Sequence, residues 1–183
     1  IAENARRALD TGNSTGALAD RLRNVPPLNV LATLARHPDL FAAWMPLAWQ
    51  LSNGVLPAAD REIVILRTAL RCGARYEWDQ HAPVAGAVGL LSSDLAAIVR
   101  GPADAHWAQP QRALLRLVDE LHATATVSDG LWRDLAAHYD ERQLIELILL
   151  VGHYHEVAFA LNALRVPADA WIGASTFPGM PAS

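Results

Sequence analysis

The chain has 183 residues, of which 52% are hydrophobic, and carries a formal net charge of −4. This length suffices for one domain with a full core but not for two ordinary domains. Every basic residue is an arginine and no basic run exceeds two residues, so the charge pattern of a nucleic-acid-binding protein is absent.

The chain contains a single cysteine, Cys72, which excludes an internal disulfide and any metal site built from several cysteines. This composition suits the reducing cytoplasm, and no signal-peptide pattern opens the chain. The most apolar run, 144–151, is too short and is interrupted by Glu146, so we expect a buried core helix there and no membrane span.

The first half of the chain predicts helices separated by short loops. Alanine and leucine dominate, and no alternation of apolar and polar residues is sustained. A short helix is expected within an N-terminal extension, 1–27. Further helices are expected at 28–36, at 38–52 with Pro38 in its first turn, at 61–71 with Asp60 as its cap, and at 75–88.

The second half continues the pattern. A helix capped by Ser92 or Ser93 should end at Gly101, and helices at 111–124 and 129–138 should follow. The last long helix, 141–164, has Asp140 as its cap and Gln143 three residues later, a variant of the capping box. We therefore predict an all-α, single-domain bundle of about eight helices over residues 28–167, followed by a tail, 168–183, that has little to bury beyond Gly173.

Two of the expected helices are apolar on nearly every side, at 63–70 and at 144–151. A helix of this kind must be enclosed all round. Full enclosure of two such helices is difficult within one small domain, so we expect a homo-oligomer, either a dimer, a trimer or a hexamer.

Three ionisable residues stand in the most apolar part of the chain. Glu62 shares a helical stripe with Ile65 and Leu66, and Glu77 and His81 lie one turn apart on the next helix. A carboxylate beside a histidine raises the imidazole pKa and orients the ring, which produces a proton donor usable near neutral pH. The alternative is an ordinary surface pair on one helix.

Other candidate residues have weaker signals. Cys72 lies between Arg71 and Arg75, which can lower a thiol pKa, although a solitary cysteine on an apolar stripe is usually inert packing. His153 lies on an inward-looking stripe. No set of three clear ligands emerges among the acids and histidines considered, so the sequence predicts no metal site.

The spacing of Glu62 and His81 resembles that of the carboxymuconolactone decarboxylase superfamily, which includes the alkylhydroperoxidase D-like proteins. The peroxidase motif E-x11-C-x2-C-x3-H aligns its glutamate with Glu62 and its histidine with His81. Its two cysteines fall on Ala74 and Glu77, so neither thiol is present. The segment at Tyr76, with YEW followed by a histidine, looks like a cysteine-free subgroup.

The decarboxylase branch resembles two further segments. HAPVAGAVGLLSSDL aligns on His81 and Gly89, and YHEVAFALNA aligns on Tyr154 and Asn162, with Glu156 and Ala158 replacing the glycine and proline of the family pattern. The resemblance covers about residues 28–167 and implies an alkylhydroperoxidase D-like helical fold.

The resemblance implies a cofactor-free acid–base enzyme, a decarboxylase-like lyase acting on a small organic acid or lactone. His81 would donate the proton and Glu77 would orient it, with Glu62 or Tyr76 completing a relay. The substrate pocket would be formed by Trp78, Cys72, His153 and Tyr154. A thiol-dependent peroxidase using Cys72 and a non-catalytic helical oligomer are the alternatives, and the missing second cysteine disfavours the former.

Overall fold

The computed structural model describes residues 28–173, 176 and 177, and this part of the chain contains eight helices and no strand. The all-α prediction is therefore confirmed. The helix expected within residues 1–27 lies outside the described residues.

The helices of the first half are α3 (Asn29–Leu34), α4 (Pro38–Ser52), α5 (Ala58–Arg71) and α6 (Arg75–Ala87). Pro38 begins α4 and Asn53 ends it, as predicted. Asp60 was wrongly predicted to cap α5. The helix begins at Ala58, so Asp60 lies within its first turn. The buried Asp60 carboxylate instead accepts a hydrogen bond from the Tyr139 hydroxyl at 2.9 Å.

The second half contains α7 (Ser92–Arg100), α8 (Gln111–Thr124), α9 (Asp129–Ala136) and α10 (Glu141–Ala163). The capping box of α10 is present, with Asp140 and Gln143 each accepting from the other's backbone N–H. The serine cap of α7 was wrong. The N-cap residue is Leu91, whose backbone N–H donates to the Asp94 carboxylate at 2.6 Å.

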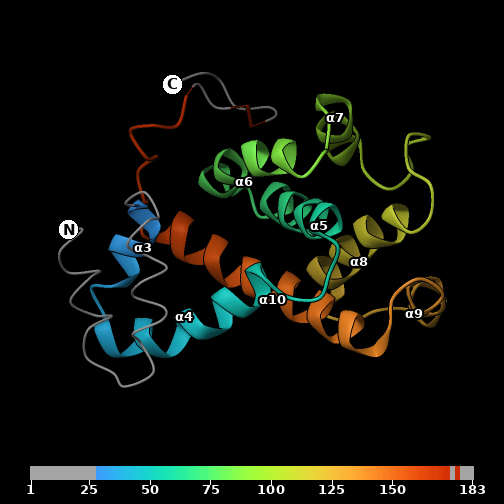
Figure 1. The fold of residues 1–183 in the computed structure, drawn as a ribbon, viewed down its shortest axis with the longest axis horizontal. Coiled ribbons are helices and arrows are strands. Elements are labelled where there is room, and N and C mark those ends of the chain that lie inside the picture. Colours follow the sequence, from blue (N-terminus) through green and yellow to red (C-terminus); the bar gives the residue numbers. More distant parts are fainter. Residues whose placement is uncertain (1–27, 174–175, 178–183) are drawn as a thin grey trace.

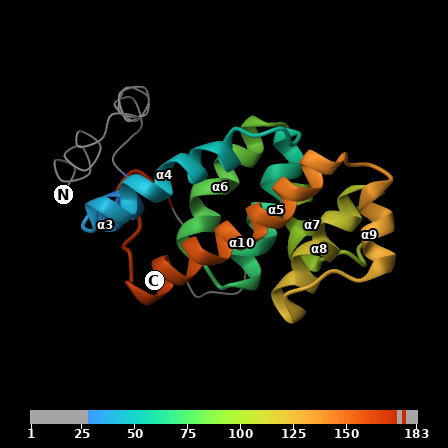
Figure 2. The ribbon, with the colours of Figure 1, turned by 90° about the horizontal axis from the view of Figure 1, so that it is seen from below.

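Helix α5 is the centre of the bundle. It packs against α6, α7, α8 and α10, and residues 62–69 are all buried. Figure 1 shows α5 between α6 and α8, with α3 and α4 at one end of the molecule and α9 at the other. The view from below in Figure 2 places α10 along the same central helix. The prediction of a fully enclosed helix is thus correct for α5.

Helix α10 is not enclosed within one chain. Ile145 is 54% exposed, Leu149 51% and Phe159 64%, and these positions follow one face of the helix. Among the described residues, α10 is the one helix whose length and composition would suit a membrane span, and half of its most apolar window is buried in the fold. The central helices of globular bundles meet the same criterion.

The C-terminal segment is held more firmly than its sequence indicated. Asp169 accepts hydrogen bonds from the Asn29 backbone N–H at 2.7 Å, the Tyr76 hydroxyl at 2.5 Å and the Gln80 amide at 2.6 Å. Beyond Gly173, Phe177 packs edge-on against Trp78 with ring centroids 5.9 Å apart. The expectation that the tail has little to bury beyond Gly173 is therefore wrong for Phe177.

Candidate active site

A buried cluster of acid–base groups forms where α5, α6 and α10 meet. His81 Nδ1 lies 2.8 Å from a carboxylate oxygen of Glu62, and His81 Nε2 lies 3.2 Å from a carboxylate oxygen of Glu77. The Tyr154 hydroxyl lies 3.4 Å from the same Nε2 atom. The two carboxylates are buried, whereas the His81 side chain keeps 18% of its surface exposed. The ring therefore has a buried carboxylate at each nitrogen and one edge toward solvent.

The local sequence explains why these groups meet. Glu62 lies near the start of α5, and Gly73, with φ at +60°, turns the chain so that α6 runs back along α5. Glu77 and His81 then lie one turn apart on α6. A residue with a side chain would be strained at Gly73, since its backbone is in the left-handed region.

The two carboxylates control the charge of His81. Burial by itself lowers the pKa of an imidazole, but the hydrogen bonds to Glu62 and Glu77 and their negative charges outweigh it and raise the pKa of His81 to about 10. At neutral pH His81 is therefore an imidazolium. Burial, followed by the charges of Glu77 and Glu62, raises the pKa of Tyr154 well above its usual value, so its hydroxyl stays protonated.

The structure separates Tyr76 from this cluster. Its hydroxyl donates to Asp169 and accepts from the Val30 backbone N–H at 3.2 Å. Burial and the hydrogen bond to Asp169 raise the pKa of Tyr76. Tyr76 therefore joins α6 to α3 and to the C-terminal segment, and the predicted relay through Tyr76 is wrong in geometry.

Trp78 is likewise directed elsewhere. It lines a cavity of about 810 Å³ between α6, α7 and the C-terminal segment, together with Ala82 and Leu95. Its indole N–H donates to the Thr176 hydroxyl at 3.1 Å. Residues 78 and 82 lie on a different face of α6 from residues 77 and 81, so Trp78 does not form a wall beside His81.

Cys72 and His153 also lie apart from His81. Cys72 is the C-cap of α5, ten positions and about 15 Å along the helix axis from Glu62. His153 is buried and stacks on Trp44 with ring centroids 5.1 Å apart. Burial lowers the pKa of His153 to about 4, so its ring is neutral. Of the four predicted pocket residues, only Tyr154 contacts His81.

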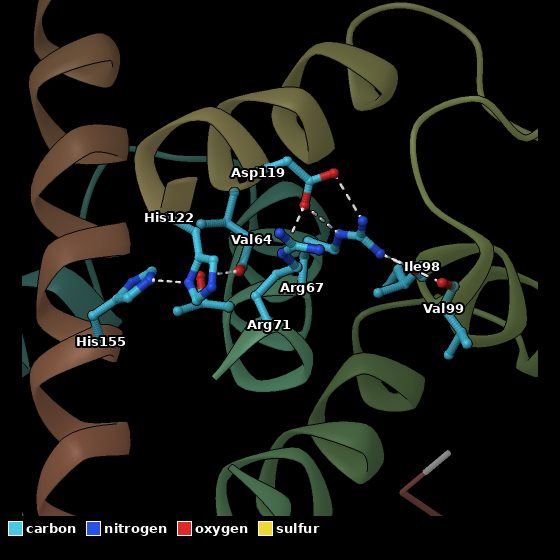
Figure 3. Close-up of polar contacts among 9 residues, drawn as sticks. Val64, Arg67, Arg71, Ile98, Val99, Asp119, His122 and His155 are labelled. Carbon is cyan, nitrogen blue, oxygen red and sulfur yellow. Dashed lines mark hydrogen bonds and ion pairs between the residues drawn. The ribbon is translucent and has the colours of Figure 1, made fainter. Parts of the chain in front are cut away.

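Two polar arrangements were not foreseen. Arg67, within the apolar run of α5, donates two hydrogen bonds to Asp119 of α8, and Asp119 also pairs with Arg71 (Figure 3). His122 of α8 and His155 of α10 face each other with ring nitrogens 2.9 Å apart. An arginine inside an almost wholly apolar helix was a signal for the first arrangement, whereas no spacing rule links His122 to His155.

Comparison with known proteins supports the assignment of the fold. Residues 38–120 match the model of the carboxymuconolactone decarboxylase family, and this range includes Glu62, Glu77 and His81. No curated protein matches the sequence.

Solved structures share the fold at low sequence identity. An alkylhydroperoxidase AhpD core protein, a peroxidase-related protein from Ralstonia eutropha JMP134, superposes with a TM-score of 0.72 at 17% identity, covering 84% of this chain and 83% of its own. A protein of unknown function from Agrobacterium tumefaciens, suggested to be the antioxidant defence protein AhpD, gives 0.67 at 19%, covering 73% and 92%.

A third similar structure is the debrominase Bmp8, in its C82A form with 2,3,4-tribromopyrrole, with a TM-score of 0.67 at 17% identity and coverage of 78% and 76%. These structures carry different descriptions, peroxidase-related in one case and debrominase in another, so their similarity supports the fold and not one reaction. Together, these comparisons show that residues 38–120 match the carboxymuconolactone decarboxylase family and that the chain has an alkylhydroperoxidase D-like fold.

Proposed function

We propose that the protein is a cofactor-free acid–base enzyme, a decarboxylase-like lyase acting on a small lactone or organic acid. The observation that carries this proposal is the His81 ring held between the Glu62 and Glu77 carboxylates, with the Tyr154 hydroxyl beside Nε2. Such a group can deliver a proton at a defined atom without any metal or redox group.

The two ring nitrogens have different roles in this proposal. The short contact from Nδ1 to Glu62 orients the ring, so Glu62 takes the part that the sequence analysis gave to Glu77. The contacts of Nε2 to Glu77 and Tyr154, at 3.2 and 3.4 Å, are longer than a strong charged hydrogen bond. Nε2 is therefore the nitrogen whose proton can be passed to a substrate.

The proposed reaction conserves atoms and charge. The bond between the carboxylate carbon and the substrate carbon that carries it breaks, and carbon dioxide leaves. The electron pair of that bond enters the unsaturated lactone, which becomes an enolate. The proton on His81 Nε2 then passes to the enolate carbon, and a proton from solvent restores the imidazolium. A buried donor fixed next to the developing charge lowers the barrier of this step.

The charge of the cluster limits how a substrate can approach. Two carboxylates and one imidazolium sum to a net charge of −1, which repels a third carboxylate, that of the substrate, when it is brought close to His81. We therefore propose that the neutral lactone end faces His81 and that the substrate carboxylate lies toward solvent. Isomerisation or lactone opening would use the same proton donor.

The thiol-dependent alternative has less support. The family positions for the two cysteines are occupied by Ala74 and Glu77, and Cys72 lies about 15 Å along α5 from Glu62. Burial raises the pKa of Cys72, and this effect exceeds the lowering by Arg71. A protonated thiol remote from His81 is a poor nucleophile for peroxide.

The non-catalytic alternative also rests on a specific observation. The cavity beside Trp78 and the small one between α4 and α10, of about 60 Å³, are not lined by Glu62, Glu77 or His81. A buried ion cluster of this kind can instead serve packing alone. The experiment must therefore separate loss of turnover from loss of stability.

The test uses a panel of unsaturated lactone acids, including carboxymuconolactone, with carbon dioxide release and lactone absorbance as readouts. We expect His81→Gln to reduce turnover by about 10²–10⁴-fold, the usual contribution of a positioned general acid. His138→Gln changes an exposed histidine of the α9–α10 connection and should leave turnover intact. Wild-type protein inert toward the whole panel, or an active His81→Gln protein, would refute the proposal.

We also propose that the exposed face of α10 pairs with a second copy of the chain. This face exposes more apolar surface than a helix of a monomeric bundle normally does, through the side chains of Ile145, Ile148, Leu149 and Phe159. Leu149→Arg should shift the mass measured by light scattering toward the monomer. Leu91→Arg, at a position 66% exposed on the α6–α7 connection, should not. A wild-type monomer at micromolar concentration would contradict this pairing.

A further inference from the structure

Three side chains able to bind a metal converge at the end of α5 away from Glu62. They are Cys72 at the C-cap of α5, His122 in the last turn of α8, and His155 in the middle of α10. Each residue offers one ligand atom: Cys72 its sulfur, and His122 and His155 one ring nitrogen each. These three atoms all lie within 4.8 Å of one another. The three residues are far apart in sequence, and helix packing brings them together.

The hydrogen bonds of His155 leave one nitrogen available to a metal. Its Nδ1 atom lies 2.8 Å from the Val151 carbonyl oxygen, which can only accept, so Nδ1 carries the hydrogen. In the neutral ring Nε2 therefore has a free lone pair, and this atom faces His122 Nδ1 at 2.9 Å. A carbonyl that fixes the far nitrogen is the usual outer support of a metal-binding histidine. Figure 3 shows the two rings meeting between α8 and α10.

The charged side chains next to Cys72 pair with one another. Arg71 is itself paired with Asp119 at 3.4 Å, and Asp119 also pairs with Arg67. The positive charge of Arg71 is therefore partly neutralised, which weakens its repulsion of a bound cation.

We propose that Cys72 Sγ, His122 Nδ1 and His155 Nε2 bind one zinc ion, with a fourth position open to solvent. A thiolate with two imidazoles is a donor set that suits zinc, and three protein ligands leave one site for water or a small ligand. The site is independent of the proposed acid–base function, because none of its residues contacts His81.

The two ring nitrogens need only a small adjustment, and the Cys72 sulfur, which lies within 4.8 Å of both, must approach them to the tetrahedral distance. Tetrahedral zinc with ordinary bond lengths separates two nitrogen ligands by about 3.3 Å and a sulfur from a nitrogen by about 3.6 Å. The two ring nitrogens must therefore move apart by about 0.4 Å, and His122, which is exposed, has room to do so. His122 must also shift its hydrogen from Nδ1 to Nε2, and the Cys72 thiol must lose its proton. Binding thus releases about one proton per ion near neutral pH.

Such an ion would join three helices that already pack together. Helix α5 contacts both α8 and α10, and the Asn162 amide of α10 donates to the Cys72 carbonyl at 3.0 Å. Because the unfolded chain does not hold the three ligands in place, zinc would stabilise the folded state.

The experiment is a titration of the purified, metal-free full chain with cobalt(II), a spectroscopic substitute for zinc. We expect one equivalent to give a thiolate-to-cobalt charge-transfer band and the intense visible absorption of tetrahedral cobalt. Zinc should displace it, and zinc should also raise the Tm. Cys72→Ser should abolish the charge-transfer band. His155→Gln should weaken cobalt binding by more than about tenfold, because the loss of a residue that only supports a ligand already weakens metal binding by about that much.

Two controls keep the result specific. His138→Gln removes an exposed histidine outside the cluster and should leave the cobalt spectrum unchanged, as should His81→Gln, which tests the acid–base site separately. Far-ultraviolet circular dichroism checks that each variant is folded. Absence of a thiolate band in wild-type protein, or its persistence in a folded Cys72→Ser protein, would overturn the assignment.

Discussion

Arg67 donates two hydrogen bonds to the Asp119 carboxylate, one from Nε at 2.9 Å and one from Nη2 at 2.8 Å. The third nitrogen, Nη1, donates to the Ile98 carbonyl oxygen at 2.7 Å. The guanidinium therefore ties the central helix α5 to both α7 and α8. Gly101 lies beside this guanidinium with φ at +93°. A Cβ at position 101 would lie 3.1 Å from Arg67 Nη2, so both the backbone conformation and the space favour glycine there.

We expect Asp119→Ala to lower the free energy of unfolding by about 3 kcal/mol, since it leaves a buried arginine without its charged partner. The measurement is urea unfolding at neutral pH. The matched control is Asp134→Ala, which breaks the Arg116–Asp134 pair, whose side chains are 36% and 42% exposed. That variant should lose less than about 1 kcal/mol. Equal losses in the two variants would contradict the role given to Arg67.

The raised pKa of His81 predicts a loss of stability at alkaline pH. The folded-state value is about 10 and the unfolded value is 6.5, so the stabilisation is fully present below about pH 6.5. It is lost as the pH rises toward 10, with a slope of at most about 1.4 kcal/mol per pH unit. Subtracting the unfolding curve of His81→Gln from that of the wild type isolates this effect, and a flat difference between pH 7 and 10 would disprove it.

His153 predicts the opposite dependence on the acid side. Its folded-state pKa is about 4, below the unfolded value of 6.5, so the unfolded chain binds a proton first as the pH falls. Stability contributed by the neutral ring is present above about pH 6.5 and is lost toward pH 4. His153→Phe keeps an aromatic ring against Trp44 and cannot titrate. It should therefore show a smaller loss between pH 6.5 and 4 than the wild type does, and an unchanged acid limb would refute this assignment.

Tyr76→Phe should affect the C-terminal segment and not turnover. The substitution removes the hydroxyl that donates to Asp169 and accepts from the Val30 N–H, at an expected cost of about 1–3 kcal/mol. Limited proteolysis should cut after residue 167 sooner than in the wild type. Activity lost in Tyr76→Phe without a change in proteolysis would restore Tyr76 to the proton relay.

Gly54 provides a test of close packing. A Cβ at this position would lie 2.2 Å from the Glu146 carboxylate, which accepts hydrogen bonds from the Val55 and Leu56 N–H groups at 2.8 and 3.2 Å. We expect Gly54→Ala to lower the Tm, because either those two bonds or the turn must give way. Gly130→Ala has open space and lies in α9, so it should be neutral or slightly stabilising. A Tm unchanged in Gly54→Ala would show that Glu146 moves aside freely.

Much of the fold was predictable because its signals are local. The ends of α4 are marked by Pro38 and Asn53, and the start of α10 is marked by Asp140 and Gln143, as their helix-end preferences predict. The apolar run after Glu62 does form a buried helix. Asp60 misled the prediction because a short acidic residue near a helix start suggests a cap. In the fold a distant hydroxyl, that of Tyr139, satisfies its carboxylate.

The candidate site was predictable only in part. Glu77 and His81 are neighbours by helical spacing, and the family resemblance adds Glu62. The direction of Trp78 and Tyr76 could not be read from the sequence, because it depends on where the C-terminal segment docks on α6. The meeting of Cys72, His122 and His155 depends on how three helices pack, and no periodicity in one segment encodes it.

Helix α5 carries Glu62, Arg67 and Cys72, so all three polar clusters depend on one helix that is enclosed by four others. A segment in that position has no way to open on its own. We expect its amide hydrogens to exchange with solvent only when the whole molecule unfolds, whereas those of the peripheral α3 and α9 exchange through local fraying. Glu62 and Arg67, both buried on α5, would then be protected by the same cooperative event, and neither could be exposed without the other.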